Sequence, residues 1–394
     1  MNKLLLFALL CVTLFGENLP LSEQKAELLK LKREKIIQDG ESGKNSWVSP
    51  VMLSTAINKN NNPSLDSQTD SAGLDWSQDL FRSGGIEYSI TQAQSAKDAN
   101  LLGVDMEEAL YLKQIYTLMT QINRDRLVYK QNELSLKNRD IDLFIIKAKY
   151  KVGSADISDL NRIAIDRDTV RTNLITLKNT LKNEEYQLKK LVGDVNIDML
   201  QLSDTPLVSK DEYIKSHLEL LQYSQKEKLN DAISGVTRSA YLPKLSFMGS
   251  LGYTKFESRL NNYEGNDYSY GAVFSMPLDI NKNSKIESSR LQQLQTKTEE
   301  LDRKLELEKE YEMHLSTIED YKEKIVLAKE MIAMYEELYS ATDAQVKAGY
   351  KSTYDLESLK NSVEIQKYEQ EIHKKNILIE KISLYFDTKH EGKQ

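Results

Sequence analysis

Between Tyr241 and Asp279 the chain reads YLPKLSFMGSLGYTKFESRLNNYEGNDYSYGAVFSMPLD, with apolar and polar residues alternating along two limbs. Alternation at a period of two places the two sets on opposite faces of a β-strand, so these residues predict a long β-hairpin. The polar segment from Glu257 to Asp267 is the expected loop between the limbs. The apolar, aromatic face carries Leu245, Phe247, Leu251, Tyr253, Tyr268, Tyr270 and Phe274.

This apolar face has two interpretations. It can pack on the core of a soluble domain, or it can face lipid, since limbs of about ten residues suit a tilted membrane-spanning strand. The hairpin stands between two long helical regions, which supply no second sheet to cover it. The hairpin alone leaves both interpretations open.

The start of the chain predicts export. Residues 1–16 contain Lys3, an apolar run too short to span a bilayer, and Gly16 at a plausible cleavage point, which is typical of a secretory signal peptide. Cys11, the only cysteine, lies inside this run and is a poor candidate for lipid modification. The mature chain would therefore have no disulfide. No later stretch is apolar enough for a transmembrane helix, so a membrane role would have to be carried by strands.

Composition and motifs argue against several classes of function. A net charge of −7 disfavours nucleic acid as a partner. Serine-triad and phosphate-loop signatures are absent, so we expect no enzyme activity, cofactor or metal. The four histidines, His217, His314, His373 and His390, have no metal-ligand spacing. His314 lies on a helical seam, where packing explains it more simply.

A fainter hairpin precedes the first long helix. Trp47 to Ile57 alternates, an Asn/Ser/Asp-rich loop is expected from Asn58 to Asp75, and the chain returns through Trp76, Ile86, Tyr88 and Ile90. Pro50 and Pro243 both stand where a hairpin begins, a position that tolerates the missing N–H.

The rest of the chain predicts long helices with coiled-coil seams. A proline-free helix is expected from Gln92 to Tyr150. A second has apolar residues every three or four positions from Leu160 to Leu191, with Arg167 and Glu184 on the same seam. A third shows the clearest seam, which runs through Tyr311, His314, Ile318, Tyr321, Ile325, Ala328, Ile332, Tyr335 and Tyr339. A repeat of 3.5 residues requires a helical partner.

The sequence is also duplicated. Gly153 and Gly349 lie 196 positions apart, Asp159-Leu160 matches Asp355-Leu356, and Pro50 matches Pro243 at nearly the same distance. Two unrelated helical hairpins would share glycine turns, because glycine is favoured past a helix end, but they would not share the proline or the Asp-Leu pair.

This order resembles the TolC-type outer-membrane efflux proteins over nearly the whole mature chain. The resemblance rests on the two tip motifs, the Tyr-Leu-Pro-Lys-Leu start of the second hairpin, and Met276-Pro277-Leu278 at its end. It implies an α+β membrane protein with four strands per chain, a homotrimer with one twelve-stranded β-barrel, and a long α-helical coiled-coil tunnel. It also implies that the apolar hairpin face contacts outer-membrane lipid.

The resemblance further implies a periplasmic gate at the helix tips, around the turns at Gly153 and Gly349. Asp355 matches an acidic residue that lines the mouth, while Asp159 and Lys351 match residues that link neighbouring hairpins. The chain departs from the family at Ser358, where a second acid is expected although Glu357 is adjacent, and at Val346, where a tyrosine is expected. The alternative is that both aspartates are helix N-terminal residues favoured by the helix dipole.

The resulting organisation has eight parts: a signal peptide (1–16), a periplasmic helix (17–46), a first hairpin (47–91), a first helical hairpin (92–193, tip near 150–156), an equatorial segment (194–240), a second hairpin (241–280), a second helical hairpin (281–386, tip near 346–352) and a disordered tail (387–394). The predicted function is a channel in the outer membrane of a Gram-negative bacterium, extending into the periplasm. With an adaptor (membrane fusion) protein and an inner-membrane pump, it would pass small molecules or unfolded polypeptides, in efflux or type I secretion. The alternative is a periplasmic coiled-coil adaptor or structural interaction protein without a pore.

Overall fold

The structure is a computed structural model that describes residues 21–62, 65–193 and 205–389. The predicted signal peptide with Cys11 lies outside the described residues, as do His390 and the last four residues. The chain divides into two compact units. We call the described residues of Met1–Lys30, Asp105–Leu218 and Lys304–Gln394 the helical unit, and those of Leu31–Val104 and Glu219–Arg303 the sheet unit.

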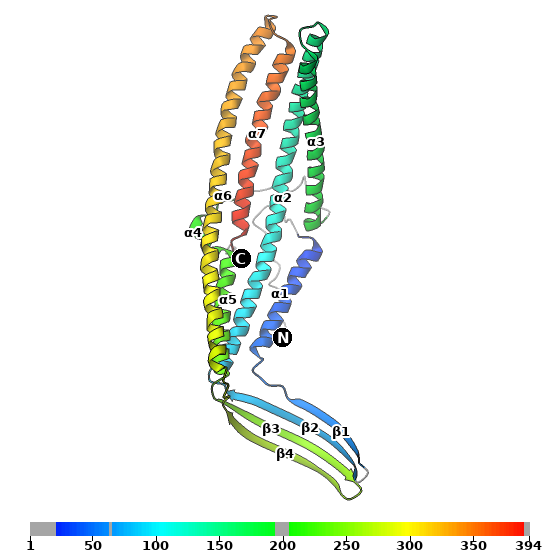
Figure 1. Ribbon diagram of the computed structural model, residues 1–394, viewed down its shortest axis with the longest axis vertical. Helices are drawn as coiled ribbons and strands as arrows, with labels where there is room; N and C mark the ends of the chain where they lie inside the picture. Colours follow the sequence, from blue (N-terminus) through cyan, green and yellow to red (C-terminus); the bar gives the residue numbers. More distant parts are fainter. Residues whose placement is uncertain (1–20, 63–64, 194–204, 390–394) are drawn as a thin grey trace, which may run out of the picture. The chain divides into compact units, whose positions relative to one another are not determined.

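The sheet unit contains one four-stranded antiparallel sheet in the order β1-β2-β3-β4 (Figure 1). The strands are β1 (Met52–Asn62), β2 (Leu65–Phe81), β3 (Lys244–Ser258) and β4 (Asn262–Ser275). Two hairpins that are distant in sequence thus join through β2 and β3, and β1 and β4 remain as edges. The prediction of four strands per chain is confirmed.

Both predicted hairpin loops are wrong in extent. The stretch from Asn58 to Asp75 is almost wholly strand, with Asn58 opposite Thr69. The second loop is likewise short, because pairing continues to Glu257 opposite Asn262. Backbone pairing with neighbouring strands outweighs the low strand propensity of these polar residues.

The predicted return strand through Ile86, Tyr88 and Ile90 is also wrong, because these residues begin helix α2 (Gly85–Lys151). Tyr88 packs against Gly235 of α5 (Leu218–Ser239), where a Cβ atom would lie 2.3 Å from the tyrosine ring. Over such a short window, alternation and a helical repeat are hard to distinguish.

Three further helices complete the sheet unit. Residues 31–44 of α1 (Glu23–Lys44) pack on α2, and α5 packs on α2 and on α6 (Lys282–Lys347). The Gln222 amide donates to the Ala99 carbonyl at 3.4 Å, and Asn230 donates to the Thr296 hydroxyl at 2.7 Å.

The helical unit is a layer of four helices in the order α3, α2, α7, α6 (Figure 1). Here α3 spans Ile157–Val192 and α7 spans Thr353–Phe386. Side-chain hydrogen bonds join each neighbouring pair. Examples are Arg167 to Asp140 at 2.6 Å for α3–α2, Asn361 to Asn138 at 2.8 Å for α2–α7, and His314 with Glu380 at 2.5 Å for α6–α7. The described helices contain no segment long and apolar enough to cross a membrane.

The predicted seams are the faces that pack. On α6, Tyr311, Ile318 and Ala328 are buried, and the remaining seam residues are partly buried, including Ile325 and Ile332. On α3, Leu174 and Leu188 are buried, and Leu188 joins Ile115, Met119, Ile122 and Val192 in one apolar cluster between α2 and α3.

In the predicted equatorial segment, His217 separates α4 (Lys210–Ser216) from α5. His217 forms an isolated β-bridge with Thr388. The prediction of a disordered tail from residue 387 is therefore wrong for its first three residues. Asp387 binds Lys113 at 2.9 Å, and Thr388 is buried.

Candidate functional site

The strand registers sort the sheet residues onto two faces. Because directly paired residues lie on the same side, Leu74, Leu251 and Tyr268 share one face, and Gly73, Gly252 and Asp267 share the other. We call these the apolar face and the small-residue face. The seven residues predicted for an apolar face all lie on the first, together with Leu53, Ile57 and Trp76.

The apolar face is largely uncovered in the chain. Tyr270 is 78% exposed, Tyr268 76% and Phe274 71%. Trp76 and Phe247 meet edge to face on it, with ring centroids 6.0 Å apart. Uncovered aromatic surface of this extent marks an interaction site rather than a solvated wall.

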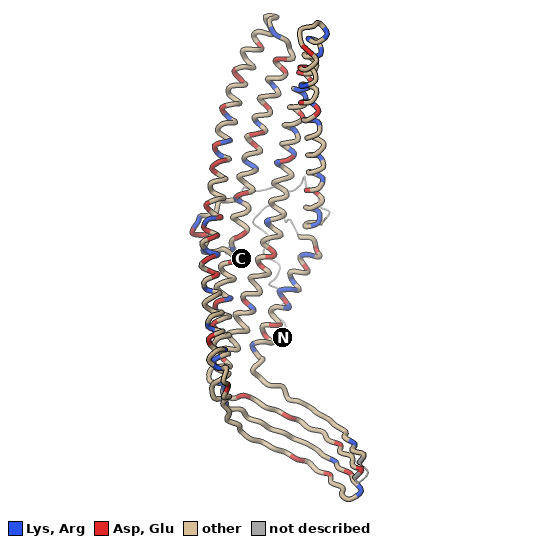
Figure 2. The backbone as a smooth tube through the Cα atoms, viewed as in Figure 1, with Lys and Arg blue, Asp and Glu red and all other residues tan. Residues whose placement is uncertain are grey.

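Charged residues bound the apolar face at one end. Lys59, Asp70, Lys255, Glu257 and Glu264 lie on the same face but next to the hairpin turns, where charges gather in Figure 2. In the helical unit, charges of both signs are instead scattered along every helix, as on a solvated surface.

The small-residue face is polar and closely fitted. The Ser250 and Ser269 hydroxyl groups are hydrogen-bonded at 2.8 Å. The Asp267 carboxylate lies over Gly252, where any Cβ atom would approach it to 2.9 Å. A side chain at position 252 would therefore have to displace the Asp267 carboxylate.

A polar cluster around Asp79 was not predicted from the sequence. Asp79 accepts a hydrogen bond from Ser246 at 2.5 Å and lies 3.4 Å from Arg82 and 4.0 Å from Lys244. The three partners come from two segments far apart in the chain, so no local spacing could reveal the cluster. Pro243, directly before β3, accepts a hydrogen bond from Ser83 at 2.6 Å, and Pro50 lies just before β1.

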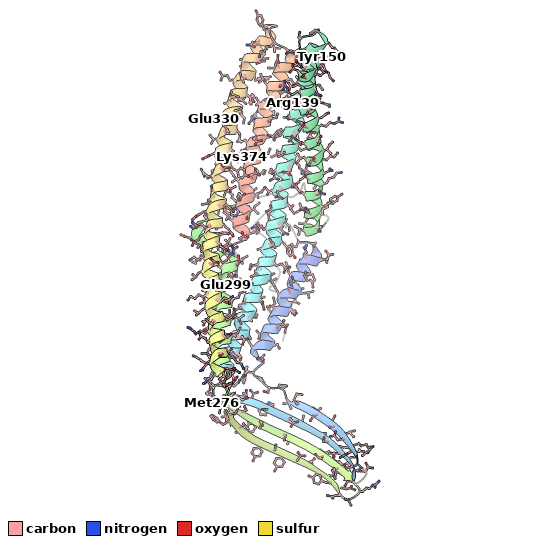
Figure 3. The ribbon with its side chains drawn as sticks, viewed as in Figure 1. Arg139, Tyr150, Met276, Glu299, Glu330 and Lys374 are labelled. Carbon is pink, nitrogen blue, oxygen red and sulfur yellow. The ribbon has the colours of Figure 1, made fainter. Side chains whose placement is uncertain are left out.

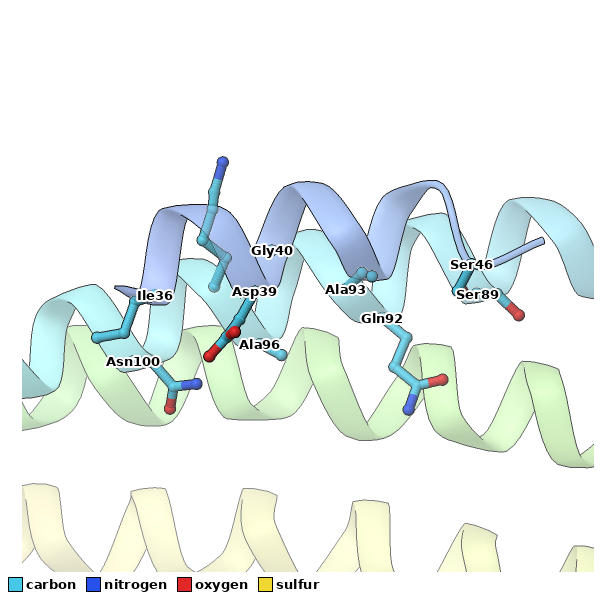
Figure 4. Close-up of a pocket in the computed structure, with 11 residues that line it drawn as sticks. Ile36, Asp39, Gly40, Ser46, Ser89, Gln92, Ala93, Ala96 and Asn100 are labelled. Atoms are coloured by element: carbon cyan, nitrogen blue, oxygen red, sulfur yellow. The ribbon is translucent and has the colours of Figure 1, made fainter. Parts of the chain in front are cut away.

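A pocket of about 370 Å³ lies in the sheet unit along α1 and α2 (Figure 4). Gly40 and Gly43 line it on α1, and Cβ atoms there would lie within 2.9 Å of Lys97 and Ala93 on α2. The glycines thus serve close helix packing. The described residues contain no cluster of His, Cys, Asp and Glu that could hold a metal ion.

The two helix tips are built alike. Gly153 (φ 74°) and Gly349 (φ 80°) adopt positive φ, which glycine tolerates without strain. The next N–H in each tip donates back over the turn, from Ser154 to Lys149 at 2.8 Å and from Tyr350 to Gln345 at 2.9 Å. This is the Schellman pattern that ends a helix. Tyr150, labelled in Figure 3, lies at the end of α2 beside the first tip.

Asp159 and Asp355 occupy the same position, the third residue of a helix. The Asp355 carboxylate accepts the Ser352 N–H at 3.3 Å in a capping box. Asp159 donates its N–H to Asp156 at 2.9 Å, and its carboxylate lies 3.8 Å from Arg162. Within one chain, both aspartates are therefore helix N-terminal residues, as the alternative prediction had it.

The structure does not bring the four predicted gate residues together in one chain. Lys351 and Glu357 are exposed, and among the described residues no ion pair joins Lys351 to Asp159. An aromatic contact that the sequence did not indicate joins α2 to α7 near the tips, with the Phe144 and Tyr354 rings 5.0 Å apart.

Comparison with known proteins identifies the class. Residues 211–386 match the family described as outer membrane efflux protein. Among solved structures, the outer membrane protein VceC from Vibrio cholerae superposes with a TM-score of 0.72 at 11% identity, covering 92% of this chain and 91% of that one. The CmeC outer membrane channel of Campylobacter jejuni gives 0.68 at 14% identity over 94% and 84%. A membrane protein from Pseudomonas aeruginosa gives 0.71 at 12% identity over 93% and 90%.

No curated protein sequence matches the chain. The fold over the described residues is that of outer-membrane channel-tunnels. The match to the outer membrane efflux protein family extends over residues 211–386, which is less than half of the chain. The predicted resemblance is thus confirmed by the family match over residues 211–386, and the predicted channel-tunnel fold is confirmed by the solved structures.

Proposed function

We propose that three copies of the chain form one passive conduit across the outer membrane and the periplasm. It carries small molecules or unfolded polypeptides that an inner-membrane pump delivers through a periplasmic adaptor protein. The described residues show no nucleotide-binding motif, so the energy comes from the pump. This proposal covers both efflux and type I secretion.

The uncovered sheet is the observation that carries the proposal. Its apolar face exposes aromatic rings, its other face carries serine, glycine and aspartate, and β1 and β4 have unpaired edges. Open edges and an exposed apolar face are unfavourable in water. Closing three sheets into one barrel pairs all edges, turns the apolar face to lipid and the small-residue face to a watery lumen.

Strand length supports the same assignment. The strands have 11 to 17 residues, whereas crossing the hydrocarbon core takes about 9–11. The excess length coincides with the charged residues near the hairpin turns, as expected for the part of a barrel that extends beyond the membrane.

The helical layer also has two uncovered edges. Ile165 and Tyr186 of α3 are 57% and 66% exposed, and Val326 and Leu327 of α6 are 55% and 58% exposed. A layer that ends in apolar residues on both sides favours continuation by further copies. A pore-free adaptor would not explain a sheet with an exposed aromatic face.

We assign the gate to the two tips as part of this proposal. In a closed trimer, Asp355 and Glu357 would ring the periplasmic mouth, while Asp159 and Lys351 of adjacent hairpins would link them. Support comes from the matching geometry of the tips and from the exposure of Lys351 and Glu357. A residue that caps its own helix through one carboxylate oxygen keeps further acceptor capacity for a neighbour or a cation.

Membrane fractionation combined with a heat-modifiability gel tests the proposal. We expect the chain in the outer-membrane fraction, as a band near three times its 45.2 kDa mass that collapses to the monomer on boiling. Recovery as a monomer in the soluble periplasmic fraction would contradict the proposal.

A further inference from the structure

The two hairpins have the same internal register. Ser54 pairs with Gly73 in the first hairpin, and 196 positions later Ser250 pairs with Ser269 in the second. The glycine tips are separated by the same 196 positions. An offset of 196 positions therefore relates the strand pairing of the two hairpins and the positions of the two tips.

Because of this equivalence, the pairing between the two repeats inside the chain, which we call the internal joint, predicts how the same surfaces pair between copies. Inside the chain, β2 of the first repeat pairs with β3 of the second. The equivalents of these strands, β4 and β1, are the two free edges. We infer that β4 of one copy pairs with β1 of the next in the register of the internal joint, an inference that rests on the proposed trimer.

The template fixes the partners. Trp76 pairs with Gly249 and Ala72 with Tyr253 inside the chain. The equivalent pairs between copies place Ala272 opposite Leu53, and Tyr268 opposite Ile57. Leu53, Ile57 and Tyr268 are 72%, 73% and 76% exposed in the single chain, so this joint covers them.

The faces agree only in this register or in one shifted by an even number of residues. Ile57 and Tyr268 both belong to the apolar face, so it continues across the joint. A slip of one residue would set Tyr268 against Asn58 and reverse the faces of the next copy.

The helical unit yields a parallel joint with different chemistry. Inside the chain, Asn138 of α2 receives a hydrogen bond from Asn361 of α7, which is 9% exposed. Their equivalents are Met334 on α6 and Ile165 on α3, which are 42% and 57% exposed. We infer that α3 of one copy covers α6 of the next and that Ile165 contacts Met334 there.

At a second position, too, the contact inside the chain and the equivalent contact between copies differ in chemistry. The internal stack of Tyr116 on Phe386, with centroids 5.1 Å apart, corresponds to Glu312 and Lys190. These residues have opposite charges, so they are compatible with direct contact between copies. A head-to-tail contact of this kind closes into a ring when the rotation between copies permits.

Cysteine pairs test the sheet joint in the full-length protein. With Leu53→Cys and Ala272→Cys together, oxidation should give covalent trimers; the matched pair Ser54→Cys with Ala272→Cys, one residue out of register, should not. The unsubstituted chain controls for Cys11. Cross-linking of the control pair alone, in a protein that is still an outer-membrane trimer, overturns the register. If the unsubstituted protein forms no trimer, the proposed function is overturned instead.

An asparagine exchange tests the helical joint. Met334→Asn or Ile165→Asn alone should lower the temperature at which the trimer dissociates, because each leaves an amide facing an apolar side chain. The double variant recreates the internal Asn138–Asn361 pair and should recover part of the loss. Additive losses in the double variant would contradict the contact.

Two acidic groups between α2 and α3 carry a second, independent inference. Asp125 is 6% exposed and accepts a hydrogen bond from Arg124 at 2.6 Å. Glu184, on the facing seam of α3, interacts with Asp125, and its Oε2 atom is buried with no hydrogen-bond partner among the described residues. Glu185 beside it binds Arg126 at 3.3 Å.

Neutral Glu184 fits this site better than the ion does. With its proton, Glu184 can donate to the Asp125 carboxylate, whose charge Arg124 balances. Without the proton, two carboxylates share one arginine where Asp125 is buried and Glu184 is partly buried. Burial and the neighbouring Asp125 raise the pKa of Glu184 to about 7.

We propose that this shared proton is a pH-sensitive clamp between α2 and α3. The folded state holds the proton more tightly than a locally opened state does. The clamp is therefore complete below the ordinary glutamate pKa of 4.5 and is lost as the pH rises through about 7. The equilibrium for local opening should rise up to about tenfold per pH unit across this window and level off above it.

Hydrogen exchange across the pH range tests the clamp, with rates corrected for intrinsic exchange. Amides flanking Glu184 and Asp125 should lose protection between pH 4.5 and about 7 in the unsubstituted protein. In Glu184→Gln the protection should be independent of pH, and in Asp125→Asn the loss should be smaller and level off at lower pH, because Asp125 no longer raises the pKa of Glu184 in the folded state. The matched control, Glu185→Gln, should retain the full pH dependence. Protection that is flat in the unsubstituted protein, or unchanged in Glu184→Gln, overturns the proposal.

Discussion

The sheet and the helical unit place their apolar residues in opposite ways. In the helical unit, seam residues such as Ile318 and Leu188 are buried against neighbouring helices of the same chain, at 2% and 0% exposure. In the sheet, Tyr270 and Phe274 are more than 70% exposed. The helical seams stabilise the chain by themselves, whereas the sheet needs a surrounding medium or partner to make its apolar face favourable.

Truncation of a seam residue should have the largest effect. Ile318→Ala removes buried methyl groups from the α6 seam and should cost about 2–5 kcal/mol of stability. Phe274→Ala, the matched truncation on the sheet, should cost the detergent-solubilised protein much less. Thermal unfolding in detergent compares the two variants. Equal losses would show that Phe274 is as closely packed within the protein as Ile318.

Arginine substitution on β4 should separate the two sheet faces. Phe274→Arg places a charge on the apolar face and should cost about 2–4 kcal/mol if that residue lies near the bilayer midplane. Ser269→Arg, on the small-residue face, should leave assembly intact and change the conductance. The measurements are trimer yield in vesicles and single-channel current. Equal tolerance of both substitutions would rule out a lipid-facing assignment.

Loss of a tip cap should have a smaller effect. Ser352→Ala removes the acceptor for the Tyr354 N–H and should destabilise the start of α7 by about 1 kcal/mol. Hydrogen exchange at the second tip measures it, with Ser358→Ala as a control that leaves the cap intact. Unchanged protection in Ser352→Ala would mean that the cap contributes nothing.

The gate substitutions should have the smallest energetic effects. Asp355→Asn should weaken cation selectivity while leaving the trimer intact, and the difference should fade at high salt, since the screening length is about 8 Å at physiological ionic strength. Asp159→Ala or Lys351→Ala should loosen the closed state by no more than about 1 kcal/mol per link. Planar-bilayer recordings measure both, and unchanged conductance and selectivity in all three variants would remove the tips from the gate.

The sequence predicted the second hairpin and the seams because their periodicity is strong and local. Leu245 to Met276 alternates over both limbs, and Tyr311 to Tyr339 follows a heptad. The first hairpin was harder, because Asn58 to Asp75 contains few apolar residues and becomes strand through pairing with β3. Ile86 and Ile90 fit either a strand or a helix over a few residues.

The site was less predictable than the fold. The tip glycines could be found from the sequence because a turn with positive φ favours glycine at that position. Ser246 and Lys244 beside Asp79, and Asp125 beside Glu184, come from other segments of the chain, and no local spacing marks them. For Asp159 and Asp355, sequence reasoning had two interpretations, and a single chain displays only their positions in the first turn of a helix.

Tryptophan reporters on adjacent residues of β4 test most directly whether the apolar face meets lipid. The chain has two tryptophans, Trp47 and Trp76, which are first replaced by phenylalanine. In vesicles, Tyr270→Trp should be quenched by brominated lipid chains and shielded from aqueous iodide, while Ser269→Trp should show the reverse. If brominated lipid quenches neither reporter, or both equally, the sheet is not the wall of a membrane channel.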